Sequence, residues 1–198
     1  MGRTQRGFTL IELLISVGLG FVVMAAIYNV FISQNRVYEF QSSVVAMNEA
    51  ALTGIDVMLR DLRTIGYRDS SGNPILLANP KQVSFRADLN DDGTLEQVEF
   101  KEVSQEGAAS LVRIENAGAE QTLVKHLEPS AGVQFKYYDK DGGAVIDTST
   151  QAQRNTIRSM KVLIAVQTNR LDPISNTYKV VKLETYVRPR NLAGFAAP

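Results

Sequence analysis

The sequence predicts an α+β protein in which one long N-terminal helix packs on an antiparallel β-sheet. The first observation is that no proline occurs between Met1 and Ile65, where apolar residues recur at helical spacing. The second is that short alternating stretches, separated by turn residues, follow from Ile75 onward. The chain has 198 residues, which is enough for one hydrophobic core beside the helix.

The first part of the helix is predicted to cross a membrane. Residues 8–32 contain no proline and a single charged residue, Glu12. A helix over this stretch is about 37 Å long, enough to span the hydrocarbon core of a bilayer with some tilt. Arg3 and Arg6 precede it, and basic flanks stay in the cytoplasm. The rest of the chain is therefore expected on the exported side.

The second part of the helix, residues 33–66, is predicted to enter the exported domain. Apolar residues continue beyond Ile32 at steps of three and four, which is typical of a helix that buries one stripe. Gly66, Tyr67 and the polar residues before Pro74 provide a stop. The helix is thus expected over residues 8–65, and three glycines are weak points within it: Gly18, Gly20 and Gly54.

The residues that lead into the apolar run form a specific motif. No small-residue cleavage site follows the run, as it would in a secretory signal. Gly7 to Glu12, read as GFTLIE, instead strongly resembles the class III signal of type IV pilins and type II secretion pseudopilins. The resemblance implies that residues 1–7 are a cytoplasmic leader, that a prepilin peptidase cuts between Gly7 and Phe8 and methylates Phe8, and that Glu12 serves assembly. A plain signal anchor with a chance glutamate is the alternative.

Three further stretches narrow the resemblance. Residues 59–67 place Arg-Asp-Leu-Arg before Gly-Tyr at the end of the helix, and residues 133–139 and 188–192 add to the pattern. Together they resemble the PilW-like minor pilins and, more loosely, the J-type minor pseudopilins. The resemblance implies a pilin-like fold. Its implied partners are other pilins and minor pilins, prepilin peptidase and an inner-membrane assembly platform. The charges of Arg60, Asp61 and Arg63 are themselves typical of a solvated helix face with local ion pairs.

Residues 67–198 are predicted to form the β-rich domain. Hairpin spacing favours antiparallel pairing of the predicted strands, which are residues 83–87, 98–101, 110–114, 133–138, 159–167 and 179–187. Turns are expected at residues 116–118, 141–143 and 172–173. Residues 144–157 are polar and are predicted to form a loop or a short helix.

One acidic loop has the spacing of a calcium-binding loop. Oxygen-bearing residues stand at its first, third, fifth, seventh, ninth and twelfth positions with Gly93 at the sixth, as calcium loops require, and they are Asp88, Asn90, Asp92, Thr94, Glu96 and Glu99. Strands rather than helices are predicted on either side. An acidic hairpin turn is the alternative, because Asp-Gly favours tight turns by itself.

Composition argues against catalysis and against a nucleic-acid surface. The 21 basic side chains are balanced by 21 acidic ones, so no polycationic patch is predicted and no specific nucleic-acid partner is expected. The chain has no cysteine and a single histidine, His126, which is expected on a strand or at the surface. Neither a phosphate-binding glycine loop nor a zinc motif occurs, so the chain is not expected to be an enzyme.

The sequence therefore indicates a minor pilin that helps to assemble or prime a type IV pilus. Two alternatives remain open: a minor pseudopilin of a type II secretion pseudopilus, and a surface-binding or adhesion module carried on a pilus. In each case the expected location is the bacterial inner membrane, crossed once, with an exported periplasmic domain that joins the fibre.

Overall fold

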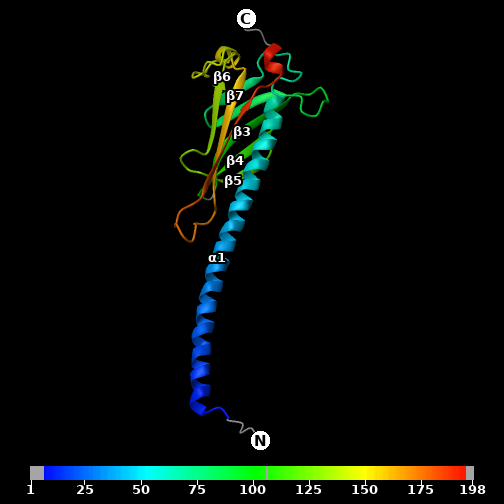
Figure 1. Ribbon diagram of the computed structural model, residues 1–198. Helices are drawn as coiled ribbons and strands as arrows, with labels where there is room; N and C mark the ends of the chain where they lie inside the picture. The colour runs from blue at the N-terminus through cyan, green and yellow to red at the C-terminus, as the bar shows by residue number, and fades with distance from the viewer. Residues whose placement is uncertain (1–6, 106, 195–198) are drawn as a thin grey trace, which may run out of the picture.

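A single helix runs the length of the molecule, and a curled β-sheet lies along its C-terminal half (Figure 1). The computed structural model describes residues 7–105 and 107–194. Helix α1, Leu10–Arg63, has 54 residues and is about 81 Å long. It begins two residues later and ends two residues earlier than predicted, because Thr9 and Thr64 cap its ends. Gly66 follows with a φ of 76°, the left-handed conformation that glycine adopts most readily.

The remaining described elements are strands and two helices of four residues each. The strands are β1 (Ile75–Asn79), β2 (Gln82–Ala87), β3 (Glu96–Gln105), β4 (Ala108–Glu115), β5 (Gln121–Leu127), β6 (Val133–Tyr138), β7 (Ser159–Gln167) and β8 (Val180–Val187). Helix α2 (Gln151–Arg154) lies in the segment predicted as a loop or short helix, and a 3₁₀ helix covers Asn191–Gly194. Every predicted strand is present, but β1 and β5 were not predicted because neither shows a clear alternation.

All strand pairs are antiparallel, as predicted. The order is β1-β2-β3-β4-β5-β7-β6, and β8 pairs with β7. The sheet curls so that β6 lies near β1, the first strand of the sheet. Tyr137 Oη on β6 donates to the carbonyl of Asn79 on β1 at 2.8 Å. The segment that carries α2 covers the outer edge of β1, since Gln151 Nε2 donates to the Ile75 carbonyl at 3.1 Å.

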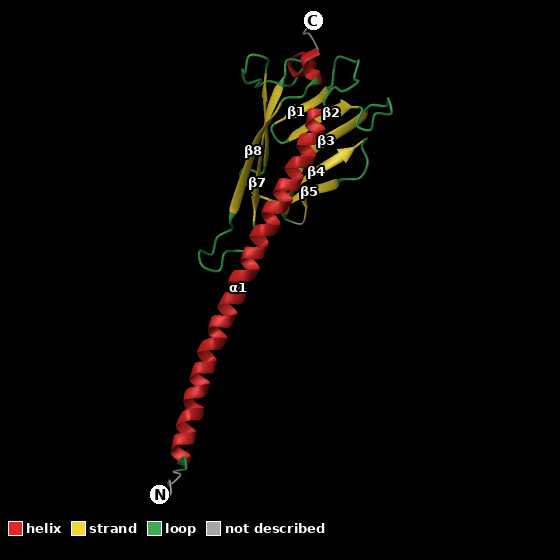
Figure 2. Ribbon diagram, turned by 45° about the vertical axis from the view of Figure 1, so that its right-hand side comes forward, coloured by secondary structure: helices red, strands yellow, loops and turns green. Residues whose placement is uncertain are grey.

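The C-terminal half of α1 packs on β5, β7 and β8 (Figure 2). It buries one stripe, whose apolar members are Met47, Ala51, Ile55, Met58 and Leu62. Gly54 belongs to the same stripe and marks the closest approach to the sheet. A Cβ atom at this position would lie 2.2 Å from Val124 Cγ2 of β5. The predicted weak point in the helix is therefore the position where only glycine fits.

The end of α1 carries a buried charge that sequence reasoning placed in solvent. Asp61 is buried, and its Oδ2 lies 2.7 Å from Arg113 Nε of β4. Arg113 also pairs with Glu115 at 2.7 Å. Burial opposes the charge of Arg113, but the hydrogen bonds to Asp61 and Glu115 raise the pKa of its guanidinium. The prediction of a solvated face is wrong for Asp61, because its partner lies 52 residues away on a strand and is invisible to local spacing.

Candidate functional site

The start of α1 is fixed by a reciprocal pair of hydrogen bonds between Thr9 and Glu12. The Glu12 amide donates to Thr9 Oγ1 at 3.3 Å, and the Thr9 amide donates to Glu12 Oε2 at 2.8 Å. This is a capping box, which satisfies amides that have no partner within the helix. The Thr9 hydroxyl also donates to Glu12 Oε2 at 2.8 Å. The carboxylate of Glu12 is thus held beside the first turn, next to the predicted mature N-terminus.

The bond predicted to be cleaved lies outside the helix. Gly7 and Phe8 precede the N-cap in a stretch without regular structure, and the Phe8 residue is 88% exposed. A peptidase needs an accessible backbone outside regular structure, and the Gly7–Phe8 peptide satisfies both conditions. The rest of the predicted leader, residues 1–6 with Arg3 and Arg6, lies outside the described residues.

The N-terminal half of α1 is an exposed apolar surface. Its large apolar residues from Phe8 to Phe31 are between 50% and 88% exposed. Helix α1 is long and apolar enough to cross a membrane, and its most apolar window has no buried residue. Within this half, Ser16 Oγ donates to the Glu12 carbonyl at 2.7 Å and Asn29 Nδ2 donates to the Ala25 carbonyl at 3.0 Å. The Ser16 hydroxyl and one N–H of the Asn29 amide are therefore satisfied within the helix.

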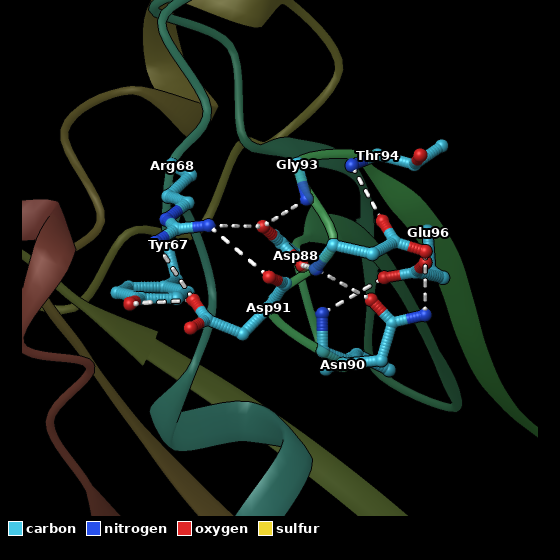
Figure 3. A network of polar contacts seen from close by, with 10 residues as sticks. Tyr67, Arg68, Asp88, Asn90, Asp91, Gly93, Thr94 and Glu96 are labelled. Atoms are coloured by element: carbon cyan, nitrogen blue, oxygen red, sulfur yellow. Dashed lines mark hydrogen bonds and ion pairs between the residues drawn. The ribbon is translucent and has the colours of Figure 1, made fainter.

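The acidic loop between β2 and β3 is organised around the buried carboxylate of Asp88 (Figure 3). Asp88 Oδ2 accepts from the Gly93 amide at 3.0 Å and from Arg68 at 3.1 Å, while Oδ1 accepts from the Asp92 amide at 3.2 Å. Arg68 also pairs with Asp91 at 2.9 Å. The hydrogen bond to Asp88 and the charge of Asp91 raise the pKa of Arg68. A guanidinium thus already neutralises the centre of the loop.

The other predicted ligands each have a different partner. Asp92 Oδ1 accepts from the Thr94 amide at 2.7 Å, and Asp92 Oδ2 accepts from Asn90 Nδ2 at 2.9 Å. Glu96 Oε2 accepts from the Leu89 amide at 2.8 Å. Glu99 lies further along β3, where Oε1 accepts from Gln82 Nε2 at 2.7 Å.

The loop in this arrangement does not fit a calcium ion. Among residues 7–105 and 107–194, no group of three or more histidine, aspartate or glutamate side chains is placed to hold a metal. Calcium requires six to eight oxygens around one point, whereas these oxygens accept from separate donors. Calcium binding therefore stays a prediction from spacing, and it requires Arg68 to leave Asp88.

One cavity beside the helix was missed by sequence reasoning. It measures about 340 Å³ and lies between α1 and strands β5 and β7, where Ala46 and Ala50 face His126 and Lys125. His126 is half-buried on β5, as expected, and has a φ of 57° where the β4–β5 pairing is irregular. The signal available in the sequence was the recurrence of small residues at helical spacing, at Ser43, Ala46 and Ala50. Ser43, Thr122 and Lys125 also line this cavity, but Ser43 Oγ donates to the Phe40 carbonyl rather than to His126.

Comparison with known proteins adds to these observations. Residues 2–28 match a family model described as the prokaryotic N-terminal methylation motif. No curated protein matches the chain. Among solved structures, the chain is similar to the type IV-like pilin TTHA1219 from Thermus thermophilus, with 12% sequence identity and a TM-score of 0.39. That match covers 73% of this chain and 97% of the other.

The motif lies at the head of an exposed apolar helix, and the second half of that helix packs on an antiparallel sheet. This chain therefore carries the prokaryotic N-terminal methylation motif, over residues 2–28, on a fold of one long helix packed on an antiparallel sheet.

Proposed function

We propose that this chain is a minor pilin that is processed by prepilin peptidase and takes part in the assembly or priming of a type IV pilus. The observation that carries the proposal is the exposed apolar half of α1, preceded by an accessible Gly7–Phe8 peptide. An apolar surface of this length is shielded from water only by a membrane or by other apolar helices. A subunit that passes from the inner membrane into a fibre uses both environments in turn.

Glu12 is the residue through which we expect neighbouring subunits to recognise one another. A carboxylate in an apolar helix bundle needs a partner, and the free N-terminal amine of an adjacent processed subunit supplies one. The capping box keeps Oε2 with Thr9. The Glu12 residue is exposed, so such an amine can approach its carboxylate.

Processing is tested by determining the N-terminus of protein extracted from membranes. The first residue is expected to be Phe8, carrying one added methyl group on its amine. Retention of residues 1–7 in cells with an active prepilin peptidase contradicts the proposal. Replacement of Gly7 by a bulkier residue is expected to block cleavage, while the same change at Gly2, outside the predicted cleavage site, leaves it intact.

Assembly is tested with Glu12→Gln, which keeps the shape of the side chain and removes its charge. The variant is expected to insert in the membrane and fold, but to be depleted from sheared fibres. Incorporation equal to the wild type shows that Glu12 does not act in assembly. Ser16→Ala is a matched control one turn further along the helix.

The alternative of a type II secretion pseudopilin predicts a different phenotype for loss of the gene. A pilus role predicts fewer or shorter surface fibres with normal protein secretion. A pseudopilus role predicts retained secretion substrates with normal fibres. A surface-binding module predicts normal numbers of fibres that no longer attach, and no described feature favours it.

A further inference from the structure

The loop between β7 and β8, residues 168–179, is the part of the domain that lies beside the middle of α1 (Figure 2). Arg170 in this loop forms an ion pair with Glu39 of α1. Glu39 stands seven residues beyond Ile32, where the apolar run ends, so the loop meets the helix about 10 Å above that point. The headgroup layer on each side of a bilayer is about 5–8 Å thick. The ion pair thus lies just outside the headgroup layer. The tip of the loop lies lower, because Pro173 and Ile174 line a hollow that reaches Val37, five residues or about 8 Å beyond Ile32. If α1 crosses a membrane at residues 8–32, the tip therefore reaches the outer edge of the headgroup layer.

The loop presents apolar side chains at this level. Ile174 is 85% exposed, and Leu171 and Tyr178 are 43% and 48% exposed. Tyr38, which precedes Glu39 on α1, is 72% exposed. Tyrosine is favoured at the membrane–water boundary because its ring is apolar and its hydroxyl is polar. An isoleucine this exposed contributes little to the domain core.

The loop is an ordered turn that holds Ile174 at its tip. The Asp172 amide donates to the Thr177 carbonyl at 2.9 Å, and the Asn176 amide donates to the Asp172 carbonyl at 2.8 Å. At the base of the loop, the Thr168 amide donates to the Lys179 carbonyl at 2.9 Å. An ordered turn loses little conformational entropy when its apolar tip leaves water.

The charges around the tip suit lipid phosphates. Arg36, Arg170 and Lys179 carry three positive charges, against two negative charges on Glu39 and Asp172. The excess is small, but the loop is tethered by α1 and does not have to find the membrane. Tethering gives it a high effective concentration at the surface, so one or two apolar side chains are enough for contact.

We propose that the β7–β8 loop is a membrane-surface contact, in which Ile174 and Leu171 enter the headgroup layer of the bilayer that α1 crosses. The inference rests on the proposed membrane crossing by α1. A second copy of the chain is a different occupant, but the height of the loop is fixed within each single molecule by Glu39 and Arg170. Contact with lipid therefore requires no neighbouring subunit.

The chain has no cysteine, so a single introduced cysteine gives one labelled position. The full chain is reconstituted in vesicles of phosphatidylethanolamine and phosphatidylglycerol, with a polarity-sensitive dye at Ile174→Cys, Ile146→Cys or Ala25→Cys. Ile146 is the matched control, because it is 93% exposed and lies between β6 and β7 at the far end of the domain (Figure 1). Ala25 reports the membrane crossing itself.

The expected result is quenching at position 174 by a nitroxide carried on the lipid headgroup, with severalfold weaker quenching by aqueous iodide than at position 146. Adding Ile174→Asp to a Ser175→Cys reporter is expected to restore iodide quenching there to the level of position 146. Neither result is expected to depend on the ratio of protein to lipid.

Three outcomes overturn the inference in distinguishable ways. If position 25 is quenched by acyl-chain nitroxide while position 174 behaves like position 146, α1 crosses the membrane but the loop does not touch it. If position 25 is not quenched, the membrane crossing fails and the loop contact fails with it. If shielding at position 174 disappears when the protein is diluted in lipid, its occupant is a second copy.

Discussion

Replacing Gly54 by alanine tests whether α1 and the sheet meet as closely as the structure shows. In an exposed helix interior this change stabilises by roughly 1 kcal/mol, because alanine loses less backbone freedom on folding. Here the new Cβ would lie 2.2 Å from Val124 Cγ2, where ordinary contact needs about 3.5–4.0 Å. Val124 is fully buried, so its side chain has no free space to enter. Overpacking of this kind costs about 1–3 kcal/mol.

The gain in helix propensity and the cost of overpacking have opposite signs, so the sign of the change in unfolding free energy shows which of them is larger. We expect Gly54→Ala to lower the free energy of unfolding by roughly 1 kcal/mol, the difference between the overpacking cost and the gain in helix propensity. The assay is urea denaturation of the full chain in detergent, followed by near-ultraviolet circular dichroism of its 7 tyrosines. The double variant Gly54→Ala, Val124→Ala provides the mutant cycle, in which a favourable coupling above about 0.5 kcal/mol is expected.

Two glycines in the same helix serve as controls. A Cβ at Gly18 or Gly20 meets nothing within 4 Å, so alanine there is expected to leave the unfolding of the domain unchanged. An increase in stability for Gly54→Ala of the size expected from helix propensity alone refutes the argument. It shows that helix and sheet separate at no cost at this position.

Three further predictions concern the charged and polar groups of the domain. Asp61→Asn removes a charge from the pair with Arg113 and is expected to lower the free energy of unfolding by about 1–3 kcal/mol, as measured by urea denaturation. The loss is smaller than for a fully buried pair, because Arg113 keeps its ion pair with Glu115. Burial raises the pKa of Tyr137 above its ordinary value of 10.0, so the folded state keeps this hydroxyl protonated where the unfolded chain ionises. The stability from this group is fully present below pH 10 and falls as the pH rises further, and Tyr137→Phe is expected to flatten that alkaline loss in a pH series of unfolding midpoints. The calcium hypothesis predicts that the midpoint of thermal unfolding is higher in millimolar calcium than in chelator. Asp92→Ala is expected to abolish this gain, and Arg68→Ala is expected to enlarge it. If calcium and chelator give identical unfolding curves for the wild type and both variants, the loop is only a turn held by Arg68.

Much of the fold follows from local sequence signals. The helix follows from the absence of proline and from the apolar spacing, and its ends were displaced by two residues because capping by Thr9 and Thr64 depends on hydrogen bonds rather than on hydrophobicity. Strands β6 and β7 have the predicted bounds because their residues alternate or are continuously apolar. Strand β1 has five residues, of which the first four are apolar and do not alternate, so periodicity does not distinguish it from a loop or from a buried turn of helix.

In the candidate site, too, local features could be predicted from the sequence, whereas contacts between distant residues could not. The motif from Gly7 to Glu12 is contiguous and was found directly, and the family model matches residues 2–28. The pairing of Asp61 with Arg113 and the contact of Gly54 with Val124 join residues far apart in the chain. In the acidic loop, the spacing of oxygens predicted a calcium site, and calcium binding stays a prediction. Arg68 lies twenty residues before Asp88 and is absent from the spacing rule, yet it occupies the centre.

Because helix α1 is unbroken, a tilt of its first half also moves the domain that packs on its second half. Its first half is held by whatever surrounds the apolar surface, and its second half is fixed to the sheet, with no hinge between the two in Leu10–Arg63. Because the helix is about 81 Å long, a tilt of about 10° at its N-terminal end carries the opposite end sideways by about 14 Å. A small reorientation within the membrane or fibre is thus amplified into a large displacement of the distal face of the domain.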